Sequence, residues 1–168
     1  RDNFLESLAH ISSGDTNIPD RMNDSYTTAL QSLIKAGADV NAVDKNGMTA
    51  LMKVHYDMNL DRIKILLDSG ADVNIRAKNG TTAILQMAIR SSIMLNLHGE
   101  LSERNPIQAL INAGADVNIK NEDGDNVLTI ILKKPAINYY VSLFANAELL
   151  RYFPNDSAIE LELTKMQI

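Results

Sequence analysis

Cysteine is missing from the sequence, which excludes a disulfide framework, a cysteine nucleophile and any metal site built on thiolates. Long apolar runs are missing too, since no stretch approaches the roughly 20 residues needed to span a bilayer. Basic residues are outnumbered by acidic ones, 16 against 21, and the formal net charge is −5. This balance gives no sign of a general affinity for nucleic acid or for anionic membranes.

Catalytic and metal-binding motifs are also missing. The three histidines, His10, His55 and His98, lie far apart, and none has the spacing of a metal-ligand pair. No glycine-rich phosphate loop follows a strand, and no nucleophile motif surrounds a serine or an aspartate. The acidic run 122–125 lacks the alternating ligands and the distal glutamate of a calcium loop, so a hairpin turn is favoured there. We therefore expect no enzymatic activity, no cofactor and no metal.

One pentapeptide, Gly-Ala-Asp-Val-Asn, occurs three times, at 37–41, 70–74 and 114–118. The second copy begins 33 residues after the first, and the third begins 44 residues after the second, which is the same period with 11 residues added. A fixed period of this size indicates an array of structural repeats. With 168 residues, the chain has room for one domain or one elongated array.

Each repeat reads as a helix followed by two turns. The apolar residues before Gly70 and Gly114 have helical spacing with one buried face. The glycine then ends the helix, because the position after the C-cap favours a left-handed backbone. Ten residues further on stands a second glycine, preceded by Asn or Asp, which favours a tight hairpin turn. The residues that we expect to cap the following helices are Thr49, Thr82 and Asn126.

These residues resemble the ankyrin repeat, and the unit 46–74 matches its pattern without a gap. The likeness covers roughly residues 25–147. The sequence departs from the family at its Thr-Pro-Leu-His motif, which here reads Thr-Ala-Leu-Met at 49–52, Thr-Ala-Ile-Leu at 82–85 and Asn-Val-Leu-Thr at 126–129. The resemblance implies an all-α solenoid of stacked helix pairs joined by β-hairpin loops, with N- and C-terminal capping helices.

The repeat register divides the chain into three parts. Residues 1–36 form an N-terminal cap or degenerate repeat, residues 37–147 the repeats, and residues 148–168 a C-terminal cap or tail. Within the first part we expect a helix over 4–14, a loop over 15–24 and a second helix beginning at Ser25 or Thr28.

The same register predicts three helix pairs. The first comprises 49–58 and 61–69, and the last comprises 126–133 and 138–145. The second pair begins at Thr82 and resumes at Asn105, which we expect to be an N-cap followed by proline in the first turn.

Two segments leave alternatives open. The 11 added residues lie within an insertion at about 90–104, whose apolar side chains either pack over the array or contact a partner; packing is favoured. The tail carries both a capping-box pattern at Ser157 and a strand-like alternation, and we favour a helix. The chain begins at Arg1, and we expect it to be part of a longer protein.

The ankyrin resemblance implies protein recognition through a concave face to which each repeat contributes one hairpin tip and one short helix. We expect the partner to be another protein, with no nucleic acid or membrane involved. By motif position the candidate contacts are Val43, Lys45, Asn46, Met48, Tyr56, Asp57, Arg76, Lys78, Asn79, Thr81, Ile89, Arg90, Lys120, Glu122, Asp123, Asp125, Lys133 and Lys134. Tyr56, Met48 and Arg76 are the preferred anchors, because aromatic, Met and Arg side chains are enriched in interfaces.

Two other functions are compatible with the sequence. The array could be the targeting module of a larger enzyme or of a pathogen effector, or it could be a structural spacer or self-assembly unit. We expect the isolated chain to be monomeric. A cysteine-free ankyrin-like chain also favours an intracellular place of action, in the cytoplasm or in a host cytosol if it is a secreted effector.

Overall fold

A computed structural model describes residues 20–54, 59–90 and 106–133, together with Ser157 and Thr164. These residues form helices and turns, and none of them lies in a β-strand. The helices are α2 (Asp20–Lys35), α3 (Ala50–Lys53), α4 (Leu60–Asp68), α5 (Ala83–Arg90), α6 (Pro106–Asn112) and α7 (Val127–Leu132). Among these described helices, none combines the length and the apolar character that a membrane span needs.

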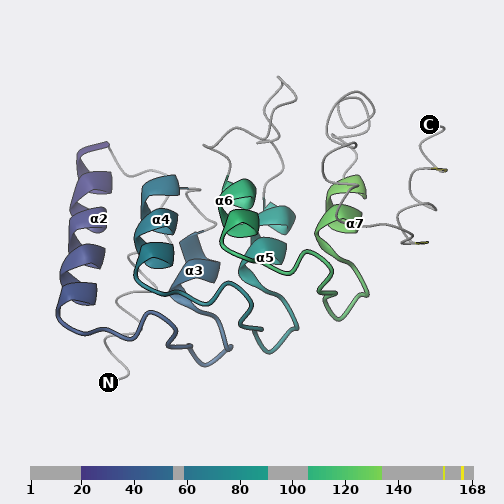
Figure 1. Cartoon of the computed structure of the whole chain (residues 1–168), viewed down its shortest axis with the longest axis horizontal. Helices are drawn as coiled ribbons and strands as arrows, with labels where there is room; N and C mark the ends of the chain where they lie inside the picture. Colours follow the sequence, from purple (N-terminus) through teal and green to yellow (C-terminus); the bar gives the residue numbers. More distant parts are fainter. Residues whose placement is uncertain (1–19, 55–58, 91–105, 134–156, 158–163, 165–168) are drawn as a thin grey trace.

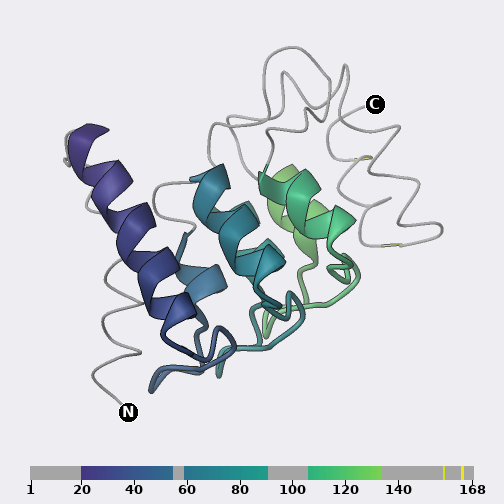
Figure 2. The same cartoon turned by 60° about the vertical axis from the view of Figure 1, so that its left-hand side comes forward.

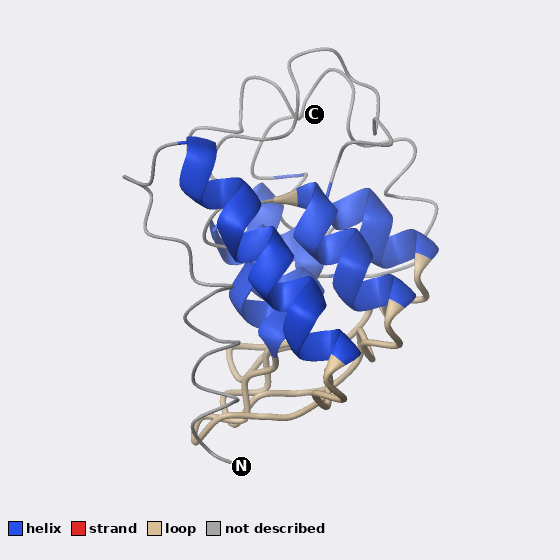
Figure 3. Cartoon of the chain, turned by 90° about the vertical axis from the view of Figure 1, so that its left-hand side faces the viewer, coloured by secondary structure: helices blue, strands red, loops and turns tan. Residues whose placement is uncertain are grey.

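The helices stand in two rows. One row consists of α2, α4 and α6, and the other of α3, α5 and α7, with each helix in contact with the next in its row (Figure 1). The view in Figure 2 shows the first row as parallel helices that step along the molecule. The described loops that run from the first row to the second, residues 36–49, 69–82 and 113–126, lie along one edge, where they are drawn in tan in Figure 3. This arrangement confirms the predicted all-α stack of helix pairs.

The core between the rows is apolar and comes from every described repeat. Leu51, Leu66 and Leu110 are fully or almost fully buried, on α3, α4 and α6. The helix α5 is buried along most of its length, because it packs against α3, α6 and α7. Met52 and Leu85, which stand where the family carries a histidine, are 1% exposed and belong to this core. The positions therefore contribute apolar packing in place of a polar network.

The three pentapeptide glycines end their helices as predicted. Gly37, Gly70 and Gly114 have φ angles of 87°, 87° and 88°. Around Gly70, the Gly70 N–H donates to the Leu67 carbonyl at 3.0 Å and the Ala71 N–H donates to the Leu66 carbonyl at 3.0 Å. This pair of bonds is the Schellman motif, and the same pair recurs at the other two glycines.

Asparagine at the end of the pentapeptide joins one repeat to the next. The Asn41 side chain donates to the Gly70 carbonyl at 3.1 Å and accepts from the Asp72 N–H at 2.7 Å. The Asn74 side chain makes the same two bonds to Gly114 and Asp116, at 3.0 and 2.8 Å. The intervening 11 residues of the insertion therefore leave the register of the stack unchanged.

The start of α2 differs from the sequence prediction. A loop was predicted over 15–24, but α2 begins at Asp20, so the prediction is wrong for residues 20–24. Polar composition suggested a loop, yet acidic residues in a first helical turn interact favourably with the helix dipole. The predicted helix over 4–14 lies outside the described residues, as do the helix over 138–145, the insertion and most of the tail. The three domain boundaries stay predictions.

The predicted helix caps are confirmed in two of three cases. The Thr49 hydroxyl accepts from the Met52 N–H, and the Asn126 amide oxygen accepts from the Leu128 and Thr129 N–H groups. The Thr82 hydroxyl oxygen is buried and has no hydrogen-bond partner among the described residues, so its predicted capping role is wrong. Pro106 is the first residue of α6, as predicted, whereas Asn105 lies outside the described residues.

We predict that Asn74→Ala lowers the free energy of unfolding by about 1–2 kcal/mol, because two hydrogen bonds between repeats are lost. Asn118 is the matched control: it occupies the same motif position, but its side chain bonds to no described residue. Asn118→Ala is expected to change stability by less than about 0.5 kcal/mol. Urea denaturation of the two variants measures the difference, and equal losses would show that the asparagine bridge does not hold the repeats together.

Candidate interaction surface

The loop tips along one edge of the stack are the best-defined surface of the molecule. The tips are residues 42–48, 75–81 and 119–125, and we call them tips 1, 2 and 3. In each tip the first turn residue donates its N–H to a carbonyl four residues on, at 3.0, 2.8 and 2.9 Å in tips 1, 2 and 3. A glycine then closes the turn with φ of 75°, 73° or 80°. The tips are therefore tight turns, and because none of the described residues lies in a strand, the predicted β-hairpin loops stay a prediction.

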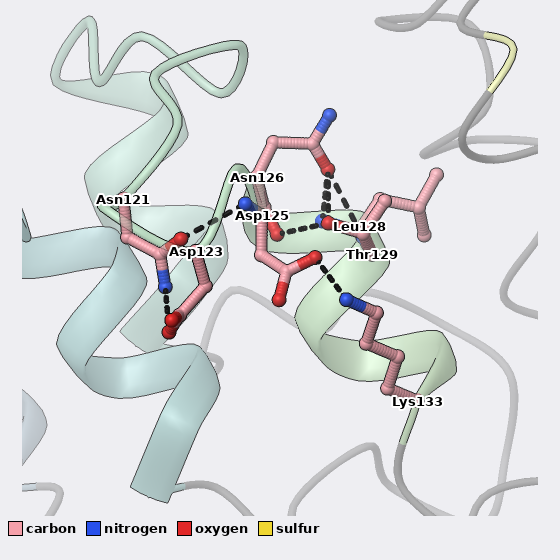
Figure 4. A network of polar contacts seen from close by, with 7 residues as sticks. All are labelled: Asn121, Asp123, Asp125, Asn126, Leu128, Thr129 and Lys133. Atoms are coloured by element: carbon pink, nitrogen blue, oxygen red, sulfur yellow. Dashed lines mark hydrogen bonds and ion pairs between the residues drawn. The ribbon is translucent and has the colours of Figure 1, made fainter.

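Polar side chains hold tips 1 and 3 from inside. In tip 1 the Asp44 carboxylate accepts from the N–H groups of Asn46 and Met48, at 2.8 and 2.9 Å. In tip 3 the Asn121 amide oxygen accepts from the Asp125 N–H at 2.8 Å, as Figure 4 shows. Tip 2 has Ala77 at this position, and its turn depends on main-chain bonds and on the Asn79 side chain.

Neighbouring tips are bonded to one another. The Lys78 N–H donates to the Asn46 carbonyl at 3.0 Å, which links tip 2 to tip 1. The Arg76 guanidinium donates to the Lys120 carbonyl at 2.8 Å, which links tip 2 to tip 3. The three tips therefore form one continuous row with fixed spacing.

Several sequence-predicted contact residues are exposed on this row. Val43 and Ile89 are the large hydrophobic side chains that the described structure leaves exposed, at 44% and 40%. The polar candidates that are exposed are Lys45, Asn46, Arg76, Lys78, Asn79, Lys120, Glu122, Asp123 and Lys133. Ile89 lies on α5, in the helix row formed by α3, α5 and α7. The other residues lie on the tips or directly after α7.

Other candidates are less accessible. Thr81 is 3% exposed, and its hydroxyl donates to Asn79 and accepts from Gln86, so a contact role for this side chain is wrong. Met48 is partly buried against the core. Asp125 is partly buried and forms an ion pair with Lys133.

Four candidates are not placed by the structure. Tyr56, Asp57 and Lys134 lie outside the described residues, and the side chain of Arg90 is not described. The preferred anchor Tyr56 is among them, and the contact roles of all three preferred anchors stay predictions.

Two charged residues have structural roles that were not predicted from the sequence. Arg62 is 1% exposed; its Nε donates to the Thr27 hydroxyl at 3.4 Å, and its guanidinium lies 5.5 Å from the centre of the Tyr26 ring. It therefore ties α4 to α2. Asp44 forms an ion pair with Lys53 at 2.7 Å, which ties tip 1 to α3.

Groups of His, Cys, Asp or Glu that could hold a metal ion do not occur among the described residues. The polar chemistry of the tips consists of turn-stabilising hydrogen bonds and exposed charges. Such a surface can bind another molecule by complementary shape and charge.

Residues 21–100 match a family model described as three copies of the ankyrin repeat. The chain contains ankyrin repeats. The structure continues the ankyrin pattern beyond the match, since the third pentapeptide repeats the Schellman motif and the bond to the preceding asparagine. No curated protein matches the chain closely. Ankyrin repeats are generally modules for protein–protein interaction.

The first prediction for this surface concerns the packing of tip 1 on tip 2. A methyl group at Gly47 would lie 3.0 Å from the Lys78 main-chain nitrogen, whereas at Gly124 no described atom lies within 4 Å. Both glycines have positive φ, so alanine costs about 1–2 kcal/mol at either site. Gly47→Ala is expected to cost about a further 1 kcal/mol or more because the tips must separate. Thermal unfolding that ranks Gly124→Ala as equally harmful would contradict the observed contact between tips.

The second prediction concerns the pH dependence of tip 1. Partial burial raises the pKa of the Asp44 carboxyl, but the hydrogen bonds from Lys53, Met48 and Asn46 outweigh it and hold the pKa below its ordinary value of 3.8. Because the folded-state pKa is depressed, the stabilising contribution of Asp44 is fully present above the ordinary value and is lost as the pH falls through the folded-state value.

We expect Asp44→Asn to be less stable than the wild type by a constant amount between about pH 5 and pH 8, and the gap to shrink below about pH 4. Denaturation in urea over this pH range measures the gap. A gap of the same size at about pH 7 and pH 3 would show that the Asp44 carboxylate does not stabilise the tip.

Proposed function

We propose that the chain recognises a partner protein through the row of tips 1–3 and the adjoining inner helices α3, α5 and α7. The match of residues 21–100 to ankyrin repeats supports protein binding in general. The observation that carries the choice of face is the row itself, in which exposed side chains stand on turns that are bonded to one another. A pre-formed surface of this kind loses little conformational freedom when it binds.

The exposed apolar side chains supply anchors for such a partner. Val43 lies on tip 1 and Ile89 lies on α5, and an apolar contact that is buried on binding contributes about 25 cal/mol per Å². Arg76 supplies a further anchor, because its guanidinium is held in position by the Lys120 carbonyl and carries further N–H donors that can meet acceptors of a partner. Hot spots in interfaces are few, and most of the remaining exposed residues are expected to contribute little.

Catalysis by the chain itself is not part of this proposal. Its place of action and its oligomeric state stay predictions, as does a role within a larger enzyme or an effector.

Affinity capture from an extract of the source cells tests the face. We expect Val43→Asp and Ile89→Asp each to reduce the captured partner at least about tenfold, since a buried charge would replace an apolar contact. Gln31→Asp on α2 is the matched control, because Gln31 is exposed on the other row and the substitution adds the same charge. Circular dichroism confirms that all three variants fold. If Gln31→Asp loses the partner, or if Val43→Asp and Ile89→Asp both capture it as the wild type does, the binding site lies away from this face.

A further inference from the structure

We propose that the row of tips binds an extended segment of the partner protein whose charges run acidic, acidic, basic along tips 1, 2 and 3. This inference rests on the proposed function and names the kind of segment that the face accepts. It comes from the distribution of charge over the three tips, which differs from one tip to the next.

Tips 1 and 2 present positive charge. Tip 2 carries two basic side chains, Arg76 and Lys78, both exposed, and no acidic one. Tip 1 carries one exposed basic side chain, Lys45. Its single acidic residue, Asp44, is mostly buried and is neutralised by Lys53 at 2.7 Å. A carboxylate placed over either tip therefore meets net positive charge within that tip.

Tip 3 has the opposite sign. Glu122 and Asp123 are both exposed at its turn, and Asp125 stands beside them in an ion pair with Lys133. Lys120 is the one basic residue within this tip and is exposed, so the tip carries three acidic side chains against one basic side chain. The Asn121 amide lies against the Asp123 carboxylate at 3.5 Å and adds no charge (Figure 4). A basic side chain is therefore favoured over tip 3.

The spacing of the tips fixes the spacing of the charges in the segment. Neighbouring helices pack about 8–10 Å apart, and the tips follow the helices. An extended chain advances about 3.3 Å per residue, so about three residues cover one tip. The charges should thus recur at every third residue. Because electrostatic screening acts over about 10 Å at 0.1 M salt, a charge interacts most strongly with the tip beneath it and more weakly with the next tip.

A second copy of the same chain fits this pattern only in part. In an antiparallel pair, tip 1 of one copy would face the acidic tip 3 of the other, but tip 2 would face tip 2 and so oppose two basic tips. Like charges opposed across an interface are unfavourable, so a different protein is the favoured occupant.

Two synthetic peptides test the order of charges. The matched peptide is Glu-Ser-Ser-Glu-Ser-Ser-Lys, and the control is Glu-Ser-Ser-Lys-Ser-Ser-Glu, both with blocked ends. The two have the same composition, and the control places its lysine over tip 2 whichever way the peptide runs. Titration of the isotope-labelled full chain, followed by amide NMR shifts at low salt, detects weak binding. We expect the matched peptide to shift residues of all three tips and to bind about three- to tenfold tighter than the control.

A charge-exchange variant keeps the net charge and alters the order. Lys78→Glu combined with Glu122→Lys should abolish or invert the preference between the two peptides, and raised salt should remove binding by the wild type. Equal affinities for the two peptides, or no shifts at the tips, would overturn the proposed order of charges. Tip signals that change with protein concentration alone would show that a second copy occupies the row, and would also overturn it.

The two proposals can fail separately. If capture from the extract depends on Val43 and Ile89 but not on the charge exchange, the face stands and the order of charges falls. If capture depends on neither, the proposed function falls as well.

Discussion

The stack depends on one side chain per repeat, the asparagine that closes the pentapeptide. Asn41 and Asn74 each accept from and donate to the main chain of the next repeat. The aspartate two residues earlier bonds to the N–H of that asparagine, at 2.9 Å in the first repeat and 2.8 Å in the second, so it fixes the turn from which the asparagine reaches out. The glycine before it ends the helix with positive φ and directs the chain into the same turn. Along the motif, the glycine thus ends the helix, the aspartate fixes the turn, and the asparagine bonds to the next repeat.

This division of tasks explains how the array tolerates its departures from the family pattern. Met52 and Leu85 replace a histidine, and both are buried in the core, where they contribute apolar packing without a polar partner. Thr129 stands at the third such position, and its hydroxyl donates to the Asn126 carbonyl at 3.0 Å. This buried hydroxyl therefore has a hydrogen-bond partner within its own helical turn. The polar contacts between repeats are instead carried by the asparagine bridges and by the bonds between tips. The 11-residue insertion lies between those contacts and leaves them intact.

The features that could be predicted from the sequence are those set by local backbone chemistry. Glycines at positive φ, the caps Thr49 and Asn126 and the proline at the start of α6 follow from residue type and spacing alone. Features that depend on how each side chain is buried were missed. Thr82 has the residue type of a cap, yet its hydroxyl is buried without a described partner. Thr81 seemed to be a surface residue, but Gln86 and the turn enclose it.

Arg62 shows where a closer sequence argument would have succeeded. It stands one residue before Ile63 and four before Leu66, on the buried stripe of α4, so its spacing placed it inside the protein although its charge suggested the surface. In contrast, no local pattern could have shown that tip 2 lies against tip 3, because Arg76 reaches a carbonyl 44 residues away. That contact decides the character of the candidate site. It places the basic tip 2 beside the acidic turn of tip 3, and the resulting change of sign along the row is a property of the stack that no single repeat possesses.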